Sequence, residues 1–335
     1  MSHNQNRVAC IGAGNLTKGM LYPLFRSEGY DVTIVCLTKA SFQSLQEGYS
    51  YVEVGPTVRK KEFSDVRVRM LDDMTESELA DCRFITTAVG GANIGRVADR
   101  LGRRRKRPDQ HIFMCENDLE SYRILKPMAG NVHASVVDRI VFYENPLKVV
   151  GEEYFSFGVL AEDNLRLPGF MNRSDNFERD YTKKRYLVNT LHTVIAWCGY
   201  AQGYETINEA LASGRVGRLA QAAAGELVSI LRHKYPQAPS GEFKRFAQTC
   251  LERFANRHLH DPILRVGRNT LDKLKPNERL LEPILYARKY GLPHAGLLES
   301  TAYGLLFNAE REASSSRGSG RESIFSYIEA TSESV

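Results

Sequence analysis

The first half of the chain alternates short, uninterrupted apolar runs with stretches in which apolar residues recur every three or four positions. The first pattern is typical of strands buried on both faces, and the second is typical of helices that cover a sheet. Their alternation predicts a doubly wound α/β sheet of the Rossmann type. The predicted strands cover residues 7–11, 32–36, 84–89, 111–115 and 136–142, and the segments 49–54 and 155–160 are expected to add strands to the same sheet.

From about residue 176 the pattern changes to a 3.6-residue period with little clustering of β-branched residues, which predicts an all-helical second part. We therefore expect a sheet domain over 1–175, a helical domain over 176–311 and a flexible Ser- and Gly-rich tail over 312–335. The predicted helices cover residues 177–199, 204–212, 214–234, 240–256, 278–290 and 294–309.

Composition places the chain among globular proteins that bury a core. It has 335 residues, of which 42% are hydrophobic and 25% charged, so a mainly disordered or fibrous chain is excluded. The six cysteines show no CxxC pair and are expected to be reduced thiols. A polar start and the absence of an apolar run of ~20 residues argue against a signal peptide or a membrane span. We expect a soluble, cytoplasmic protein.

The charge balance is mildly basic, with 45 basic and 40 acidic residues and a net charge of +5. This excess suits an anionic ligand and falls short of what nucleic-acid binding requires. The densest basic run, 103–107, lacks interleaved aromatic residues and is expected to be a solvated loop, with a phosphate or nucleic-acid contact as the alternative. His258 and His260 lack partner carboxylates in a motif, so we expect surface residues and no metal site.

A glycine-rich turn follows the first predicted strand and opens a helix, which is the context of a dinucleotide-binding site. Gly12 allows the sharp turn, Gly14 lets the backbone approach a pyrophosphate, and the helix directs its first amides at that anion. We therefore assign 1–175 to dinucleotide binding, and the candidate cofactor residues here are Gly12, Gly14, Asn15, Lys18 and Gly19.

The end of the second strand favours NADP(H) over NAD(H). NAD sites usually carry an acidic residue there to hold the ribose hydroxyls, but this chain has Cys36. No carboxylate would repel a 2′-phosphate, and Lys39 with the hydroxyls of Thr38 and Ser41 could bind one. In the alternative, Lys39 simply begins the next helix.

Two further segments are expected at the carboxyl edge of the sheet, where ligands of open α/β sheets bind. The small residues around Ala88 and Val89 would allow close approach of the nicotinamide half of the cofactor, and Asn117 would face a substrate.

The helical part opens with Lys184, Asn189 and His192. Asn189 and His192 are three residues apart and share a helix face, and the long side chain of Lys184 can reach toward the same end. Taken alone, this spacing is equally typical of a solvated helix face.

The order of several motifs along the chain is more specific than any one of them. They are Gly12–Asn15, Thr86–Gly90, Cys115–Asn117, Val137–Val141, Lys184-x4-Asn189-x2-His192, Arg265–Arg268 with Lys273, and Tyr290–His294. Together they resemble the polyol-specific long-chain dehydrogenase family, most closely its mannitol-1-phosphate 5-dehydrogenase branch, over about residues 7 to 310. The resemblance implies a Rossmann domain and a helical domain, with the active site between them and no catalytic metal.

The resemblance also implies roles for individual residues. Lys184 matches the general base, and Asn117 and Asn189 match the amides that stabilise the developing alkoxide. His192 matches a group that orients substrate hydroxyls, and Asp138 matches a residue near the lysine and the substrate. Two basic residues of the helical domain, Arg265 and Lys273, match substrate-binding positions and would suit a phosphorylated or carboxylated polyol.

The chain departs from the family pattern at Cys36, where relatives are acidic, at Leu191, where glycine is usual, and in a shorter C-terminal region. The expected function is an NAD(P)-dependent oxidoreductase that interconverts a polyol, such as mannitol 1-phosphate, and its ketose without a metal. The alternatives are an unphosphorylated polyol, a cyclitol or a sugar acid as substrate, or a nucleotide-binding sensor without turnover. Nothing suggests a nucleic-acid or membrane partner, and the resemblance leans toward a monomer.

Overall fold

The computed structural model describes residues 6–104, 107–145 and 147–315. The chain divides into two compact units, the first ending at Tyr181 and the second beginning at Thr182. Arg105 and Lys106 of the basic run, and the predicted tail from residue 316 onward, lie outside the described residues.

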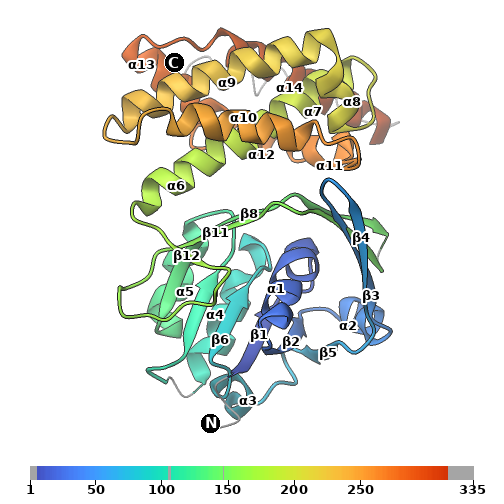
Figure 1. Cartoon of the computed structure of the whole chain (residues 1–335), viewed down its shortest axis with the longest axis vertical. Helices are drawn as coiled ribbons and strands as arrows, with labels where there is room; N and C mark the ends of the chain where they lie inside the picture. Colours follow the sequence, from blue (N-terminus) through green and yellow to red (C-terminus); the bar gives the residue numbers. More distant parts are fainter. Residues whose placement is uncertain (1–5, 105–106, 146, 316–335) are drawn as a thin grey trace. The chain divides into compact units, whose positions relative to one another are not determined.

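The first unit is built on an eight-stranded sheet of order β12-β11-β8-β7-β6-β1-β2-β5 (Figure 1). Neighbouring strands from β8 to β5 run parallel, and β11 joins β8 in the antiparallel direction. The predicted Rossmann-type α/β fold is confirmed. The strands are β1 (Arg7–Ile11), β2 (Asp31–Cys36), β5 (Arg67–Met70), β6 (Phe84–Thr87), β7 (His111–Met114), β8 (Val132–Asp138), β11 (Ser156–Val159) and β12 (Asn172–Arg173).

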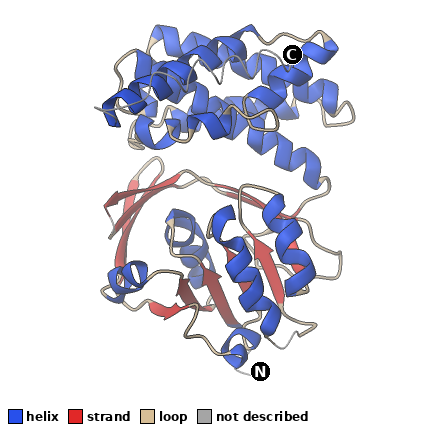
Figure 2. Ribbon diagram, turned by 180° about the vertical axis from the view of Figure 1, so that it is seen from behind, coloured by secondary structure: helices blue, strands red, loops and turns tan. Residues whose placement is uncertain are grey.

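Both faces of this sheet are buried under apolar side chains. In β1, Val8 and Cys10 belong to one buried cluster, whereas Ala9 and Ile11 belong to another. Because successive residues of a strand point to opposite faces, the two clusters are the cores on either side of the sheet. The helices of this unit are α1 (Tyr22–Ser27), preceded by a π-helical turn (Thr17–Leu21), α2 (Lys39–Gln46), α3 (Glu76–Ala80), α4 (Gly91–Arg103) and α5 (Glu120–Ala129) (Figure 2).

A second sheet of order β4-β3-β10-β9 corrects two strand predictions. Segment 49–54 is a strand, but it belongs to this second sheet and not to the main one. Segment 136–142 is not one strand, because the chain leaves β8 after Asp138 and enters β9 of the second sheet at Val141. The apolar run hides this break, since both strands are buried in the same region. The strands are β3 (Tyr49–Val54), β4 (Val58–Phe63), β9 (Val141–Asn145) and β10 (Lys148–Glu152).

Arg139 fixes the crossing between the two sheets. Its buried guanidinium donates to the carbonyl oxygens of Glu152 (2.6 Å) and Gly19 (3.0 Å) and lies 3.2 Å from a carboxylate oxygen of Glu53. These three partners come from β10, from the turn that precedes α1 and from β3. One arginine therefore ties the second sheet to the helix that follows the glycine-rich turn.

The second unit is entirely helical in its described part, as predicted. Its most buried element is α7, in which Trp197 is fully buried and donates through Nε1 to the carbonyl of Gly267 at 2.9 Å. Most predicted helix bounds agree within a few residues, while the short helices α11 and α12 were not anticipated. The helices are α6 (Phe177–Lys184), a π-helical turn (Arg185–Thr190), α7 (Leu191–Ala201), α8 (Ile207–Ala212), α9 (Gly214–Lys234), α10 (Glu242–Phe254), α11 (Ile263–Gly267), α12 (Thr270–Lys273), α13 (Leu281–Tyr290) and α14 (Ala295–Ser315).

All six cysteines are buried free thiols, which confirms the expected absence of a disulfide framework. No helix in the described part of the chain is long and apolar enough to cross a bilayer.

Gly19 offers a test of the packing between the π-helical turn and the second sheet. A Cβ at this position would lie 2.2 Å from a methyl carbon of Val141, so Gly19→Ala should destabilise the fold by about 1–3 kcal/mol. Gly225→Ala is the matched control, because nothing lies within 4 Å of a Cβ on that α9 residue. It should be stabilising by about 0.5–1 kcal/mol. Urea unfolding of both variants measures the difference, and equal stabilities would contradict this packing.

Candidate active site

The glycine-rich turn has the geometry that a pyrophosphate site needs. Gly12 has a φ of +110°, and a Cβ there would lie 2.2 Å from the carbonyl oxygen of Ala88 at the end of β6. Nothing lies within 4 Å of the corresponding position on Gly14, so its backbone is open to close approach. The side-chain oxygen of Asn15, at the start of the helix, is buried without a hydrogen-bond partner among the described residues. These three residues fit a dinucleotide.

The other two candidates in this turn lie inside the fold. Gly19 packs against Val141, which is a structural reason for glycine. Lys18 is only 4% exposed, with its ammonium 4.3 Å from the centre of the Tyr143 ring, and burial lowers the pKa of Lys18 to about 8. Cys36 at the end of β2 is close enough to act on that pKa. The positive charge therefore lies beside the strand end where NAD sites usually have a carboxylate.

The residues after β2 combine capping with exposure. The Thr38 hydroxyl caps α2 by accepting from the Ser41 N–H (3.2 Å), and it also hydrogen-bonds the Ser41 hydroxyl (2.9 Å). Lys39 is exposed in the first turn of α2. Arg96, a residue that the sequence reasoning missed, donates from α4 to the carbonyl of Leu37 at 3.2 Å. Two exposed cations thus flank the end of β2.

The turn after β6 is held by a carboxylate at the end of β7. Glu116 accepts from the backbone N–H groups of Val89 and Gly90, both at 2.8 Å, and fixes the segment that includes Ala88. Burial raises the pKa of Glu116, although the two donors act in the opposite direction. Glu116 therefore positions the turn at which we expect the nicotinamide.

The two predicted substrate residues of the first unit lie at the carboxyl ends of neighbouring strands. Asn117 follows β7 and is exposed, and its backbone carbonyl accepts from the Tyr181 hydroxyl at 3.1 Å. Asp138 is the last residue of β8 and only 4% exposed. Because β7 and β8 are parallel neighbours, both residues belong to the same edge of the sheet.

A π-helical turn explains the spacing of Lys184 and Asn189 in the second unit. Five residues apart on an α-helix, they would point about 140° away from each other. The segment Arg185–Thr190 is a π-helix, in which hydrogen bonds join residues five apart, so the two lie one above the other. Such turns are frequent at functional sites. His192 follows on α7, three residues after Asn189.

His192 belongs to a charged network that the sequence reasoning found only in part. Its Nε2 lies 3.0 Å from an oxygen of Asp261, and its ring stacks on Phe254 with centres 4.5 Å apart. Arg265 makes two hydrogen bonds to the same carboxylate, at 2.7 and 2.5 Å. Burial lowers the pKa of His192, although Asp261 opposes this, so the imidazole is neutral near pH 7. The Asp261 carboxylate lies beside Nε2, although the two atoms are not aligned for a hydrogen bond.

Lys273 is more deeply buried than a simple phosphate-binding lysine would be. It is 8% exposed, and its ammonium donates to the carbonyl of Val266 in α11. Burial, together with Arg279, Arg268 and Arg265, lowers the pKa of Lys273 to about 7. Three guanidinium groups therefore lie near one buried amine, and two of them, Arg265 and Arg279, pair with Asp261 and Glu278.

No group of three or more residues suited to hold a metal ion is found among the described residues. His258 and His260 are exposed, which confirms the expectation of surface residues.

Comparisons with known proteins show similarity to mannitol dehydrogenases. Residues 178–330 match the family model described as the mannitol dehydrogenase C-terminal domain. A mannitol-1-phosphate 5-dehydrogenase from Caldanaerobacter subterraneus subsp. tengcongensis is 26% identical, over 90% of this chain and 86% of the relative. The chain is a relative of the mannitol dehydrogenases. The predicted resemblance to the polyol dehydrogenase family is confirmed, and with it the prediction of an oxidoreductase acting on CH–OH groups.

Solved structures show the same fold in other mannitol dehydrogenase relatives. Pseudomonas fluorescens mannitol 2-dehydrogenase, solved with NAD and D-mannitol, superimposes with a TM-score of 0.71 at 15% identity, over 90% of this chain and 79% of that one. A D-sorbitol dehydrogenase superimposes with a TM-score of 0.64 at 14% identity, over 91% of this chain and 83% of that one.

The charged network of His192, Asp261 and Arg265 can be tested through the pH dependence of stability, because Asp261 titrates. Burial alone would raise the pKa of Asp261, but Arg265 and His192 outweigh it and lower the pKa to about 2. The carboxylate therefore contributes stability above pH ~4, which is lost as pH falls toward ~2. Asp261→Asn should cost about 2 kcal/mol at pH 7, and its difference from the wild type should shrink between pH 4 and pH 2.

Urea unfolding across that pH range measures the effect. Asp272→Asn is the control, because Asp272 is 67% exposed in a surface pair with Lys275 and should cost less than about 1 kcal/mol. A pH-independent loss in Asp261→Asn would show that the network does not depend on the ionised carboxylate.

Proposed function

We propose that this chain is an NADP(H)-preferring dehydrogenase that interconverts a polyol phosphate and its ketose with Lys184 as the base in place of a metal. The observation that carries the proposal is the π-helical turn that aligns Lys184 with Asn189, in a chain related to the mannitol dehydrogenases. The first unit would bind the nucleotide, and the second would supply the base and hold the substrate.

The proposed base acts on the hydroxyl proton of the substrate. Lys184 lies half-buried at the start of the π-helical turn, and as a neutral amine it would accept the proton as the alcohol becomes a carbonyl. The amide of Asn189, aligned with it, and that of Asn117 from the first unit would donate hydrogen bonds to the oxygen as its negative charge develops. A bound nicotinamide would supply the hydride acceptor or donor.

His192 would bind a substrate hydroxyl through its ring. The ring lies beside Asp261, and as a neutral imidazole it would offer its unprotonated nitrogen as the acceptor for a donor hydroxyl. Asp138, buried at the end of β8, would bind a further hydroxyl or act on the charge of the lysine. Polyols carry many hydroxyl groups, and a set of fixed acceptors suits them.

The preference for a phosphorylated substrate rests on basic side chains of the second unit. Asp261 holds Arg265 in place and compensates its charge, and Lys273 lies among Arg265, Arg268 and Arg279. The nearly neutral pKa of about 7 for Lys273 means that an arriving phosphate would draw a proton onto this amine. The mannitol-1-phosphate 5-dehydrogenase relative agrees with this substrate class.

The preference for NADP(H) rests on the end of β2. Cys36 supplies no carboxylate, and Lys39 is an exposed cation near the position of a 2′-phosphate. Arg96 lies nearby but already pairs with Asp72 at 2.6 Å. Thr38 and Ser41 would add hydroxyls, although they already bond each other. A distant structural relative was solved with NAD, so the proposed preference for NADP(H) rests on these residues and not on the fold.

Lys184→Ala tests the assignment of the base. Ketose-dependent oxidation of the reduced nucleotide should fall by a factor of about 10²–10⁴, because proton transfer loses its partner, while nucleotide affinity stays nearly unchanged. Lys183→Ala is the matched control: the neighbouring lysine pairs with Glu242 at 2.6 Å and should keep most of the activity. Steady-state rates and fluorescence titration of NADPH measure the two effects. Wild-type turnover in Lys184→Ala would rule out this base.

A further inference from the structure

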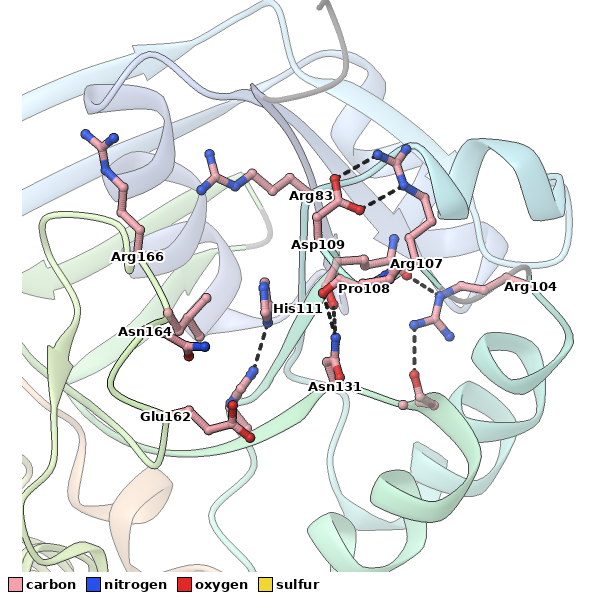
Figure 3. Close-up of a pocket in the computed structure, with 15 residues that line it drawn as sticks. Arg83, Arg104, Arg107, Pro108, Asp109, His111, Asn131, Glu162, Asn164 and Arg166 are labelled. Atoms are coloured by element: carbon pink, nitrogen blue, oxygen red, sulfur yellow. Dashed lines mark hydrogen bonds and ion pairs between the residues drawn. The ribbon is translucent and has the colours of Figure 1, made fainter.

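An open cavity of about 940 Å³ lies at the opposite edge of the main sheet from the glycine-rich turn (Figure 3). It is lined by the residues at which the parallel strands begin, including Arg83 before β6, His111 at the start of β7 and His133 near the start of β8. The proposed cofactor and substrate residues follow the far ends of the same strands. With four residues in β7 and a rise of about 3.3 Å each, the two edges are about 13 Å apart.

Four arginines line this cavity, and two of them are committed to structural partners. Arg104 donates to Gln110 and to the carbonyls of Leu101 and Ala129, so it holds the ends of α4 and α5. Arg107 makes two hydrogen bonds to Asp109, at 3.1 and 2.8 Å, and its charge is neutralised there. Both lie on one side of the cavity in Figure 3.

The other two arginines, Arg83 and Arg166, lie on the other side of the cavity in Figure 3. No carboxylate within ion-pair distance of either guanidinium occurs among the described residues. Both lie near the Tyr30 hydroxyl, and both lower the pKa of Tyr30 against the larger effect of burial. Two guanidinium groups without a carboxylate at ion-pair distance can donate several hydrogen bonds to one oxyanion.

A pair of histidines adds a third donor to this side. Nδ1 of His111 lies 3.1 Å from Nε2 of His133, and Nδ1 of His133 lies 3.3 Å from the carbonyl oxygen of Leu160. Since the carbonyl can only accept, His133 donates to it from Nδ1, and its Nε2 must then accept from His111. This leaves Nε2 of His111 as an acceptor without a partner among the described residues. A proton there would make His111 a cation and a donor.

The opposing charges are few. Asp109 is bound by Arg107, and Glu162 is an exposed carboxylate on the loop after β11. Lys126 on α5 adds a further positive influence on His133. An anion in this cavity would meet Arg83, Arg166 and His111, opposed by Glu162 and, from the neighbourhood of the Tyr30 hydroxyl, by Glu28.

We propose that this cavity binds the phosphate group of a small anion, with Arg83 and Arg166 as its ligands and His111 as a proton-dependent third donor. The site is separate from the proposed active site and does not depend on the proposed function. The phosphate could be free inorganic phosphate or part of a phosphorylated metabolite, and the experiment distinguishes them.

Binding of inorganic phosphate and of glycerol 2-phosphate is measured by isothermal titration calorimetry on the full chain. The double variant Arg83→Gln/Arg166→Gln should weaken binding by about tenfold or more, since each arginine supplies a charged hydrogen bond. Arg123→Gln removes one exposed arginine of α5 outside the cavity and should change nothing. Glu162→Gln removes the one carboxylate that no arginine binds among the described residues lining the cavity, and it should strengthen binding. Tighter binding of inorganic phosphate would indicate the free anion, and tighter binding of the ester would indicate a metabolite.

The histidine is tested with sulfate, whose charge is constant between pH 6 and pH 8. Burial lowers the pKa of His111 and Arg83 lowers it further, while a bound anion would raise it. Sulfate should therefore bind more tightly at pH 6 than at pH 8 in the wild type, and His111→Gln should remove that dependence. Arg83, Asp109, His133 and Glu162 are the charged or titratable groups that face His111, and the Glu162→Gln variant separates the titration of that acid.

Two results would overturn the proposal. One is no binding of phosphate to the wild type at millimolar concentration. The other is equal binding by the wild type and the double variant, which would place any bound phosphate elsewhere. Thermal melting of each variant checks folding. Glu162→Gln is expected to bind phosphate more tightly, and a misfolded protein could not produce that result. The KM for the ketose should be unchanged in the double variant, which keeps this test independent of the active site.

Discussion

The arrangement of the first unit depends on how tightly the segment from Gly12 to Gly19 is packed. Contacts at both ends of this segment leave no room for a side chain. At one end Gly12 lies against the backbone of Ala88, and at the other Gly19 lies against Val141 of the second sheet. Arg139 adds a hydrogen bond to the Gly19 carbonyl. Packing against both sheets therefore fixes the residues between these two glycines, where we expect the dinucleotide.

In the second unit, charged groups fix the candidate site residues, whereas in the first unit close packing does so. Asp261 is buried with Arg265 and His192, and removing a partner would leave an uncompensated charge in the interior. In the part of the chain that the structure describes, no carboxylate pairs with Lys273, which is held by a backbone carbonyl, so its proton is more easily lost. One unit therefore contains a buried neutral histidine and a readily titrated amine. This combination suits a site that binds hydroxyls and an anionic group.

The sequence allowed the main sheet to be predicted because its strands are continuous apolar runs, but it did not reveal the second sheet. The run from Val136 to Phe142 stays apolar across a change of sheet, and only the polar pair Asp138 and Arg139 marks the break. β4 escaped prediction because it is almost fully exposed and carries no apolar pattern.

The site was predictable only as far as local motifs reach. The glycine-rich turn and the Lys184 to His192 series are short-range patterns, whereas Asp261 lies 69 positions from the histidine that it contacts. Glu116 lies within the Cys115–Asn117 motif. Its hydrogen bonds to Val89 and Gly90 form only because β6 and β7 are neighbours in the sheet. The π-helical turn is not encoded by apolar spacing, and its only signal was a five-residue interval that an α-helix would not align.

The most direct measurement compares initial rates of nucleotide oxidation in four mixtures: fructose 6-phosphate or free fructose, each with NADPH or NADH. Cationic residues at the end of β2 and around Lys273 predict rapid oxidation of NADPH with the phosphate and much slower rates in the other three mixtures. Equal rates with free fructose and NADH would show that neither group of cations selects its ligand. That result would contradict both the preference for NADP(H) and the preference for a phosphorylated substrate.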